Sequence, residues 1–267
     1  MRIICLNGWG GTLWDELDGY LRAEQPDVLC LQEVVHTPAA MTGWLTYRDG
    51  DHVLPQRANL FREVNAALPR HRGTFCPAAQ GVLWDGDQAV LSEWGLATFV
   101  RADLPVIGQA KGFVHGAFSP DSYGEHPRSR TAHAVRVHDF ERGWPVTIAH
   151  MHGLRDPAWG KADTPERLAQ AHRLARLVGS VAEPGERLVV CGDFNVEPDS
   201  ETFEVLGRLG LHDLVTGGGH RDTRTSHYRK PGRLADYLLV NDAVEVLAFE
   251  VVEHPEVSDH RPLLLTI

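Results

Sequence analysis

The feature that most constrains the fold is an apolar run, Leu188-Val189-Val190, that leads directly into Cys191-Gly192-Asp193-Phe194-Asn195. Residues two positions apart on a strand point to the same face, so Asp193 and Asn195 can both face one small site. There the carboxylate can act as a base or a ligand, while the carboxamide is a neutral donor and acceptor. An ordinary Asp/Asn turn after a buried strand has the same composition, so this motif alone does not distinguish a functional site from a turn.

Other apolar runs also meet polar side chains at one of their ends. Carboxylate and carboxamide oxygens suit a hard divalent cation, which keeps several waters in its shell. We therefore expect these strand ends to converge on one metal site. The polar residues are Asn7 after Arg2–Leu6, Gln32 and Glu33 after Asp27–Leu31, and the pair Asp259-His260 before Leu263–Ile267.

Taken in order along the chain, these motifs resemble those of the endonuclease/exonuclease/phosphatase superfamily, the DNase I-like metal-dependent phosphodiesterases. The resemblance covers essentially the whole chain and is specific because six or seven motifs occur in register. It implies an α/β fold, a four-layered sandwich of two face-to-face β-sheets flanked by helices, with the site at one end. The motifs are Asn7, Leu31-Gln32-Glu33, Arg130, His150 and His152, Gly192-Asp193-Phe194-Asn195, Asp236-Tyr237 and Ser258-Asp259-His260.

The resemblance implies a metal site and a water-activating pair. Glu33, with Asn7 and Asp259, would hold Mg²⁺, with Mn²⁺ as an alternative, because all three offer only oxygen. Asp193 would orient or deprotonate the attacking water. Asn195 would hold a phosphate oxygen. The reaction would be metal-assisted in-line hydrolysis, in which catalysis is mostly positioning and charge stabilisation.

The resemblance also implies the remaining roles. His260 would stabilise charge on the phosphoryl group, with Asp236 fixing its tautomer. One histidine of the pair His150 and His152 would protonate the leaving oxygen. We assign this to His152, the last residue before Gly153, and leave His150 as a substrate-side or structural histidine. Arg130 would contact the phosphate.

At one position this chain differs from a branch of the family that it resembles, which narrows the choice of subfamily. Abasic-site endonucleases carry a second acid two residues after the first-strand asparagine, and Trp9 stands there in this chain. The chain therefore resembles more closely the branch that includes DNase I, sphingomyelinases and inositol-phosphate phosphatases. We expect a Mg²⁺-dependent phosphoesterase acting on a small or lipid-linked phosphate ester. The alternatives are a nuclease acting on DNA or RNA and, third, a catalytically silent phosphate-binding module.

The charge balance bears on this choice. Thirty-six acidic and 26 basic residues give a formal net charge of −10. A broad grip on duplex nucleic acid works through Lys and Arg side chains, so this charge favours a compact ester substrate. A local basic rim can coexist with an acidic whole, and the nuclease alternative stays open.

Length and composition predict a single catalytic domain over residues 1–267, since 267 residues with 43% hydrophobic content can bury one large core. No export signal is visible and no apolar run approaches the roughly 20 residues that span a bilayer. We expect a cytoplasmic monomer without a membrane span or an obligate protein partner. Four separated cysteines predict buried thiols rather than disulfides or a zinc site.

Hydrophobic periodicity predicts alternating strands and helices. We expect Thr12 to cap the first helix. From Asp103 to Arg130 the pattern dissolves into Gly, Pro, Ser and His, which predicts a long loop near the substrate. The expected helices are 13–23, 60–68, 164–178 and 202–209, and the expected strands are 2–6, 27–31, 88–91, 96–100, 131–137, 144–152, 236–240, 244–252 and 263–267.

Overall fold

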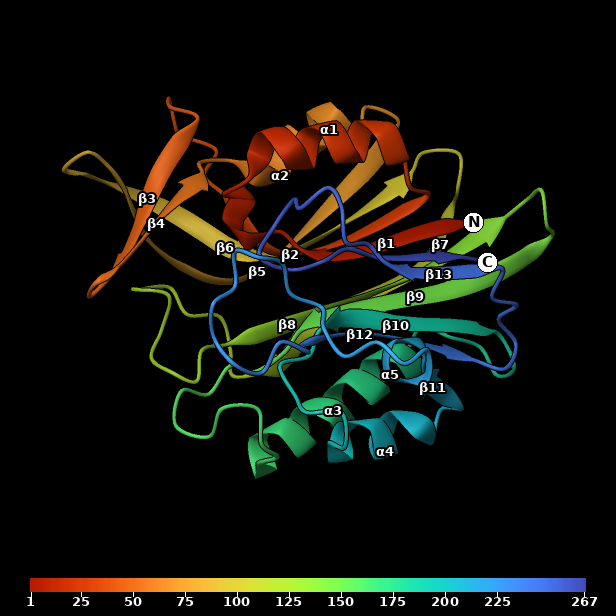
Figure 1. The fold of residues 1–267 in the computed structure, drawn as a ribbon. Helices are drawn as coiled ribbons and strands as arrows, with labels where there is room; N and C mark the ends of the chain where they lie inside the picture. Colours follow the sequence, from red (N-terminus) through yellow and green to blue (C-terminus); the bar gives the residue numbers. More distant parts are fainter.

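The structure, a computed structural model describing residues 1–267, consists of two β-sheets packed face to face with helices on both outer sides (Figure 1). Helices α1 (Trp14–Glu24) and α2 (Leu60–Ala67) cover one sheet. Helices α3 (Pro165–Gly179), α4 (Glu201–Gly207) and α5 (Leu214–Gly217) lie on the other. This confirms the predicted α/β sandwich.

The larger sheet has the strand order β13-β14-β1-β2-β6-β5-β3-β4. Only β1 and β2 run parallel in it, and every other neighbouring pair is antiparallel. A short 3-10 helix, η1 (Trp9–Gly11), follows β1. The strands are β1 (Arg2–Asn7), β2 (Val28–His36), β3 (Trp44–Asp49), β4 (His52–Arg57), β5 (His71–Asp85), β6 (Gln88–Arg101), β13 (Ala248–Val251) and β14 (Leu263–Thr266).

The smaller sheet has the order β11-β12-β10-β9-β8-β7. Here β9 and β10 run parallel, and the other pairs are antiparallel. The strands are β7 (Val106–His115), β8 (Arg130–Asp139), β9 (Trp144–His152), β10 (Arg187–Asp193), β11 (Leu211–Asp213) and β12 (Asp236–Asn241).

The strand directions bring many chain segments to one end of the sandwich. Strands β1, β2, β9 and β10 all end there, and their antiparallel neighbours β14, β8 and β12 begin there. Because β1 packs against β10 and β2 against β9, the ends of both sheets meet. The chain termini lie at the opposite end, where the amino group of Met1 donates to the Ile267 carbonyl at 2.6 Å (Figure 1).

The first strand is buried on both faces, which explains its continuous apolar sequence. Ile3 and Cys5 belong to the core between the two sheets, whereas Ile4 and Leu6 pack in the core under α1 and α2. The alternation follows the two-residue period of a strand. All four cysteines are free and buried, as expected from their apolar surroundings.

The structure corrects the expected loop from Asp103 to Arg130. Its first part forms strand β7, which pairs with β8 at the edge of the smaller sheet. Most β7 side chains are exposed or half-buried, and Gly108 and Gly112 interrupt the run. An edge strand with one solvated face has no continuous apolar signature, so periodicity did not identify it.

Further differences concern strand lengths and one cap. The expected strands 88–91 and 96–100 both lie in one long strand, β6, which pairs with the long strand β5, and the hairpin β3–β4 was not predicted. The expected strand 244–252 is limited to β13. Thr12 does not cap α1, because its hydroxyl donates to the carbonyls of Trp9 and Pro55.

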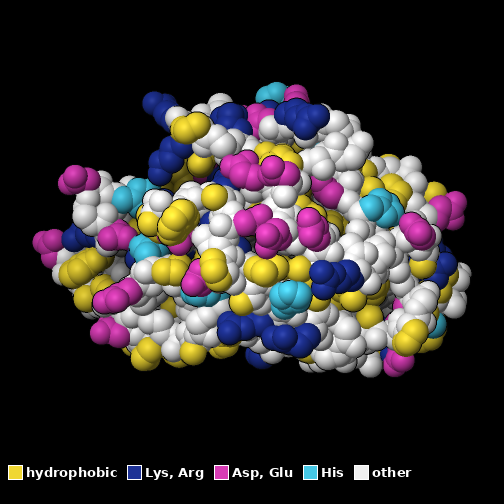
Figure 2. Space-filling model, turned by 90° about the horizontal axis from the view of Figure 1, so that it is seen from below, with side chains coloured by type: hydrophobic (Ala, Val, Ile, Leu, Met, Phe, Trp, Pro, Cys, Tyr) yellow, Lys and Arg dark blue, Asp and Glu magenta, His cyan; other side chains and the backbone are white.

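The surface carries mixed charge. On the face seen in Figure 2, Lys and Arg side chains form small groups separated by groups of Asp and Glu. No helix has the length and apolar character needed to cross a membrane.

Candidate active site

All but one of the predicted site residues lie at the end of the sandwich where the strand ends meet. The exception is His150. Most of these side chains stand at the first or last residue of a strand or in a short segment beside one, and Glu33 stands at an irregularity inside β2. The residues are Asn7, Glu33, Arg130, His152, Asp193, Asn195, Asp236, Asp259 and His260.

Asp193 is the centre of this cluster. Its Oδ2 accepts a hydrogen bond from Asn7 Nδ2 at 3.0 Å and lies 3.7 Å from the Nε2 atoms of both His152 and His260. Its Oδ1 accepts a hydrogen bond from the backbone N–H of Asn195 at 3.2 Å. A carboxylate that is 2% exposed and accepts these two hydrogen bonds is held in one orientation.

Asp236 and His260 form a second buried pair. Both carboxylate oxygens lie 2.9 Å from His260 Nδ1, and Oδ2 also accepts from the Thr223 hydroxyl at 2.8 Å. Burial raises the pKa of Asp236 to about 6 and lowers that of His260 to about 4, so both groups resist charging. The contact places the His260 proton on Nδ1 and leaves Nε2 facing Asp193.

Glu33 lies on an irregularity of β2. The pairing of β2 with β6 shifts register between Leu31 and Val34, and Glu33 adopts a positive φ of 55°. A bulge of this kind redirects a side chain. Glu33 Oε1 lies 3.8 Å from His152 Nε2, and a quarter of the Glu33 side chain is exposed.

The oxygen donors of Asn7, Glu33 and Asp259 fit a divalent cation. Burial raises the pKa of both Glu33 and Asp259, and the nearby Asp193 carboxylate raises them further. A cation between such carboxylates would relieve this cost. Asp193, Asp236 and His260 also offer atoms within 4.8 Å of one another. Asp236 is the weaker candidate ligand, because Thr223 and His260 already engage its oxygens.

Arg130 and His152 pack against Trp94, an aromatic residue that the sequence did not single out. The Arg130 guanidinium carbon lies 5.0 Å from the Trp94 ring centre, and the His152 ring lies 5.2 Å from it. Arg130 Nε donates to the Gly153 carbonyl at 2.9 Å, while its Nη1 and His152 Nδ1 are buried without partners. Burial lowers the pKa of Arg130 to about 10 and that of His152 well below its usual value.

Asn195 and Gly153 show how closely the two loops approach. Asn195 is buried and has a φ of 53°, a left-handed conformation that asparagine tolerates better than most residues. A Cβ on Gly153 would lie 2.1 Å from the Phe194 carbonyl oxygen. Only glycine fits between His152 and the segment that carries Asp193.

His150 is not brought to the cluster. It points to the same face as His152, as strand alternation requires, but it lies two residues deeper between the sheets. Gln32 Nε2 lies 3.0 Å from its Nδ1, and the Thr98 hydroxyl lies 2.8 Å from its Nε2. With 1% exposure and both nitrogens engaged, His150 has the surroundings of a structural histidine, one of the two roles that the sequence left open for it.

Arg224 is a further site residue that the sequence analysis missed. Its Nη1 donates to Asp259 Oδ2 at 3.0 Å and also contacts His260 Nε2. It lies in an irregular segment between α5 and β12. No periodicity or motif marks such a residue, because only the long-range pairing with His260 places it in the site.

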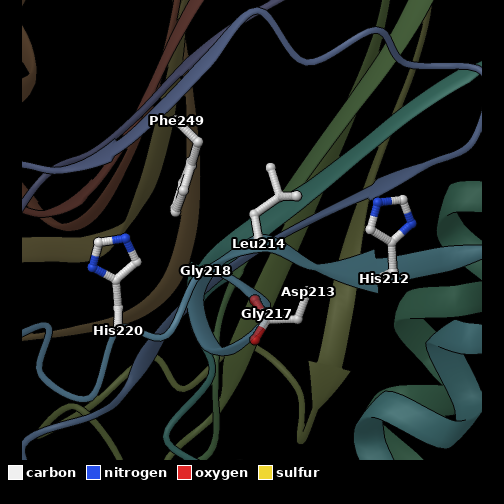
Figure 3. Close-up of a pocket in the computed structure, with 7 residues that line it drawn as sticks. All are labelled: His212, Asp213, Leu214, Gly217, Gly218, His220 and Phe249. Carbon is white, nitrogen blue, oxygen red and sulfur yellow. The ribbon is translucent and has the colours of Figure 1, made fainter.

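A hollow of about 530 Å³ lies elsewhere, where β11 and α5 meet the edge strand β13 (Figure 3). His212 and His220 lie on opposite sides of it, and Asp213 accepts from the N–H groups of Val215 and Thr216. None of the predicted site residues lines this hollow. The strand-end cluster is therefore the better candidate for chemistry.

The fold and this cluster define a DNase I-like α/β sandwich enzyme. The model of the Endonuclease/Exonuclease/phosphatase family matches residues 9–260, and the chain belongs to this family. Its members are phosphoric ester hydrolases that generally depend on a divalent metal ion, so the chain is an enzyme of that class. Comparison with curated protein sequences gives no significant match.

Solved structures share the fold over almost the whole chain. The human Nocturnin catalytic domain with bound sulfate anion is 19% identical, with 99% of this chain and 93% of that chain covered and a TM-score of 0.70. A Bacteroides thetaiotaomicron mannosyl-6-phosphatase is 13% identical, with coverages of 100% and 98% and a TM-score of 0.67. Humanized D. rerio TDP2 is 14% identical, with coverages of 99% and 97% and a TM-score of 0.63.

Proposed function

We propose that residues 1–267 form one catalytic domain, a Mg²⁺-dependent phosphoesterase that uses an activated water for in-line attack. The main support comes from three groups that meet at Asp193 Oδ2. Asn7 Nδ2 lies 3.0 Å from this oxygen, and two imidazole Nε2 atoms lie 3.7 Å from it. A buried carboxylate between two histidines suits proton transfer at a phosphoryl group.

Glu33, Asp259 and Asn7 would hold the metal, with Mg²⁺ preferred and Mn²⁺ as a substitute. When bound, the ion supplies a Lewis acid that neutralises charge on the phosphoryl oxygens. The acidic character of the site supports this assignment. Burial first, and the nearby Asp193 carboxylate after it, raise the pKa of Glu33 and Asp259, and a bound cation would offset both effects.

Asp193 orients the attacking water and accepts its proton. The hydrogen bond from Asn7 and the backbone N–H of Asn195 fix the carboxylate, so little reorganisation is needed during reaction. The Asn195 carboxamide, two residues further on, holds a phosphate oxygen.

His260 stabilises the charge that develops on the phosphoryl group, and Asp236 fixes its tautomer and supports the imidazolium form. His152 protonates the leaving oxygen. Burial disfavours the charged form of His152, and an adjacent phosphate anion offsets this because it favours a positive neighbour. Arg130 contacts the phosphate from the side of His152.

The preferred substrate is a small or lipid-linked phosphate ester. A net charge of −10 and the separated groups of Lys and Arg in Figure 2 support this choice over a polyanion. The fold neighbours also include a mannosyl-6-phosphatase. The alternative is a nuclease acting on DNA or RNA. A catalytically silent phosphate-binding module is disfavoured, because the matched residues around Asp193 are all present.

A substrate panel tests the proposal. The Mg²⁺-loaded protein is assayed with chromogenic phosphodiesters, phosphorylated sugars and lysophospholipid-type esters alongside duplex DNA and structured RNA. We expect higher kcat/KM values on the compact esters. Faster cleavage of plasmid DNA or long RNA would promote the nuclease alternative, and no turnover of any member with Mg²⁺ or Mn²⁺ would contradict the proposed function.

A further inference from the structure

Arg224 is a buried cation that none of the assigned roles uses. It is 6% exposed and lies among the carboxylates of Asp193, Asp236 and Asp259. Its Nη1 donates to Asp259 Oδ2 at 3.0 Å, and arginine stays protonated in proteins. The side chain is therefore a permanent positive charge inside the acidic cluster.

The backbone around Arg224 is tightly held. Arg224 pairs with His260 as an isolated bridge, and the neighbouring Thr225 N–H donates to the Asp259 carbonyl at 3.1 Å. The Thr225 hydroxyl donates to the Ser258 carbonyl at 2.7 Å. The segment that carries Arg224 is thus fixed beside the segment that carries Asp259 and His260.

Only part of the Arg224 guanidinium has hydrogen-bonding partners, in contrast to the backbone around this residue. Nη1 makes the contacts to Asp259 and His260, and the guanidinium carbon lies 4.2 Å from the ring centre of Tyr228. Nε is buried without a partner, and no hydrogen bond within the protein uses Nη2. Nε and Nη2 form the edge of the guanidinium that matches two oxygens of a phosphate.

We propose that Arg224 is a further phosphate-contacting residue of this active site, which contacts Asp259 and His260 through Nη1 and offers its Nε–Nη2 edge to a phosphoryl group. Asp259 is also a proposed metal ligand, so Arg224 and the metal ion compete for its carboxylate. The identity of the ligand rests on the proposed function. The Tyr228 ring, 4.2 Å from the guanidinium carbon, packs against this side chain and helps to keep it in the site.

The test compares Arg224→Gln with Arg221→Gln. Arg221 is an exposed arginine three residues earlier on the same segment, so its variant has the same change in net charge. Binding of inorganic phosphate to the Mn²⁺-loaded protein is measured by calorimetry, and Mn²⁺ binding without phosphate by electron paramagnetic resonance. Hydrolysis of the best panel substrate is measured in parallel.

For Arg224→Gln we expect phosphate affinity and kcat/KM to fall about 10- to 100-fold, the range for losing a charged hydrogen-bonding partner. We expect Mn²⁺ to bind more tightly, because Asp259 no longer has a competing cation. An arginine that only supports the structure would weaken Mn²⁺ binding when removed. Arg221→Gln should match the wild type in all three measurements.

Arg224→Lys keeps the test decisive if the glutamine variant does not fold. Lysine retains the positive charge but lacks the two parallel N–H donors of the guanidinium edge. The variant should therefore keep its Mn²⁺ affinity near the wild-type value, while its phosphate affinity falls. Phosphate and Mn²⁺ affinities within twofold of wild type in a folded Arg224 variant overturn the proposal. Both binding measurements need no turnover, so they judge Arg224 even if the wild-type protein hydrolyses no ester and the proposed function fails.

Discussion

Both carboxylate oxygens of Asp236 lie 2.9 Å from Nδ1 of His260, at the point where two distant parts of the chain meet. The pair is buried, and the Thr223 hydroxyl satisfies one of the same oxygens. His260 is therefore presented to the site in one orientation, with Nε2 directed towards the Asp193 carboxylate.

Breaking this pair should impair catalysis more than folding. We expect Asp236→Asn and His260→Ala to lower kcat by about 10²-fold or more, the usual effect of losing an oriented proton-transfer or charge-stabilising group. Asp242→Asn, at a fully exposed aspartate beyond the end of β12, is the control. Steady-state kinetics with circular dichroism checks the prediction, and an Asp236→Asn enzyme with wild-type kcat would contradict it.

The two histidines of β9 should separate catalysis from stability. His152→Ala should lower kcat by about 10²-fold with a small change in Tm. His150→Ala removes one buried hydrogen-bonding partner from Gln32 and one from Thr98, so it should lower the free energy of unfolding by roughly 1–3 kcal/mol and affect kcat less. If His150→Ala is the variant with the greater loss of kcat, their assignment is wrong.

His133 should make stability sensitive to acid. Burial lowers its pKa to about 4, below the value of about 6.5 for an unfolded histidine. Between these values the unfolded chain binds a proton that the native protein does not. The contribution of neutral His133 to the free energy of unfolding is therefore fully present above pH ~6.5. It is lost as the pH falls towards 4, and the loss is on the order of 3 kcal/mol.

Urea unfolding between pH 7 and pH 5 measures this effect. The slope of the free energy of unfolding against pH reports how many more protons the unfolded chain binds than the native protein. We expect this number to be smaller by up to about one in His133→Gln than in wild type. The comparison is needed because Asp236, whose pKa burial raises, acts in the opposite direction. His172→Gln, at an exposed position on α3, is the control variant. An unchanged slope in His133→Gln would refute the assignment.

The dependence of KM on salt should distinguish the two substrate classes. A pocket that recognises one phosphate ester should show a weak dependence, whereas a groove that follows a polyanion should lose affinity steeply. We expect a slope of log KM against log salt that corresponds to about one or two phosphate contacts. A slope that corresponds to six or more, measured with duplex DNA, would favour a nuclease.

The sequence could predict the meeting of strand ends because the polar residues stand directly beside apolar runs. Asn7 and Asp193 end runs buried on both faces, and the packing of β1 against β10 brings them within hydrogen-bonding distance. Strand alternation also placed His150 and His152 on one face. It could not show that His150 lies deeper, because depth depends on how the second sheet packs over the strand.

Other features depend on contacts that leave no local pattern. Strand β7 is an edge strand with a solvated face, so its sequence resembles a loop. Trp94 and Arg224 reach the site from a long hairpin and from an irregular segment. Their roles follow from the packing against Arg130 and His260, residues far away in the sequence.

The most direct test of the account measures hydrolysis of a chromogenic phosphodiester by wild type, Glu33→Gln and the exposed control Glu16→Gln, in EDTA and after addition of Mg²⁺. We predict that wild type and Glu16→Gln are inactive in EDTA and fully active in Mg²⁺. Glu33→Gln should stay folded yet lose most activity and bind Mn²⁺ more weakly. Full turnover in EDTA, or a wild-type rate for Glu33→Gln, would contradict the metal-dependent mechanism.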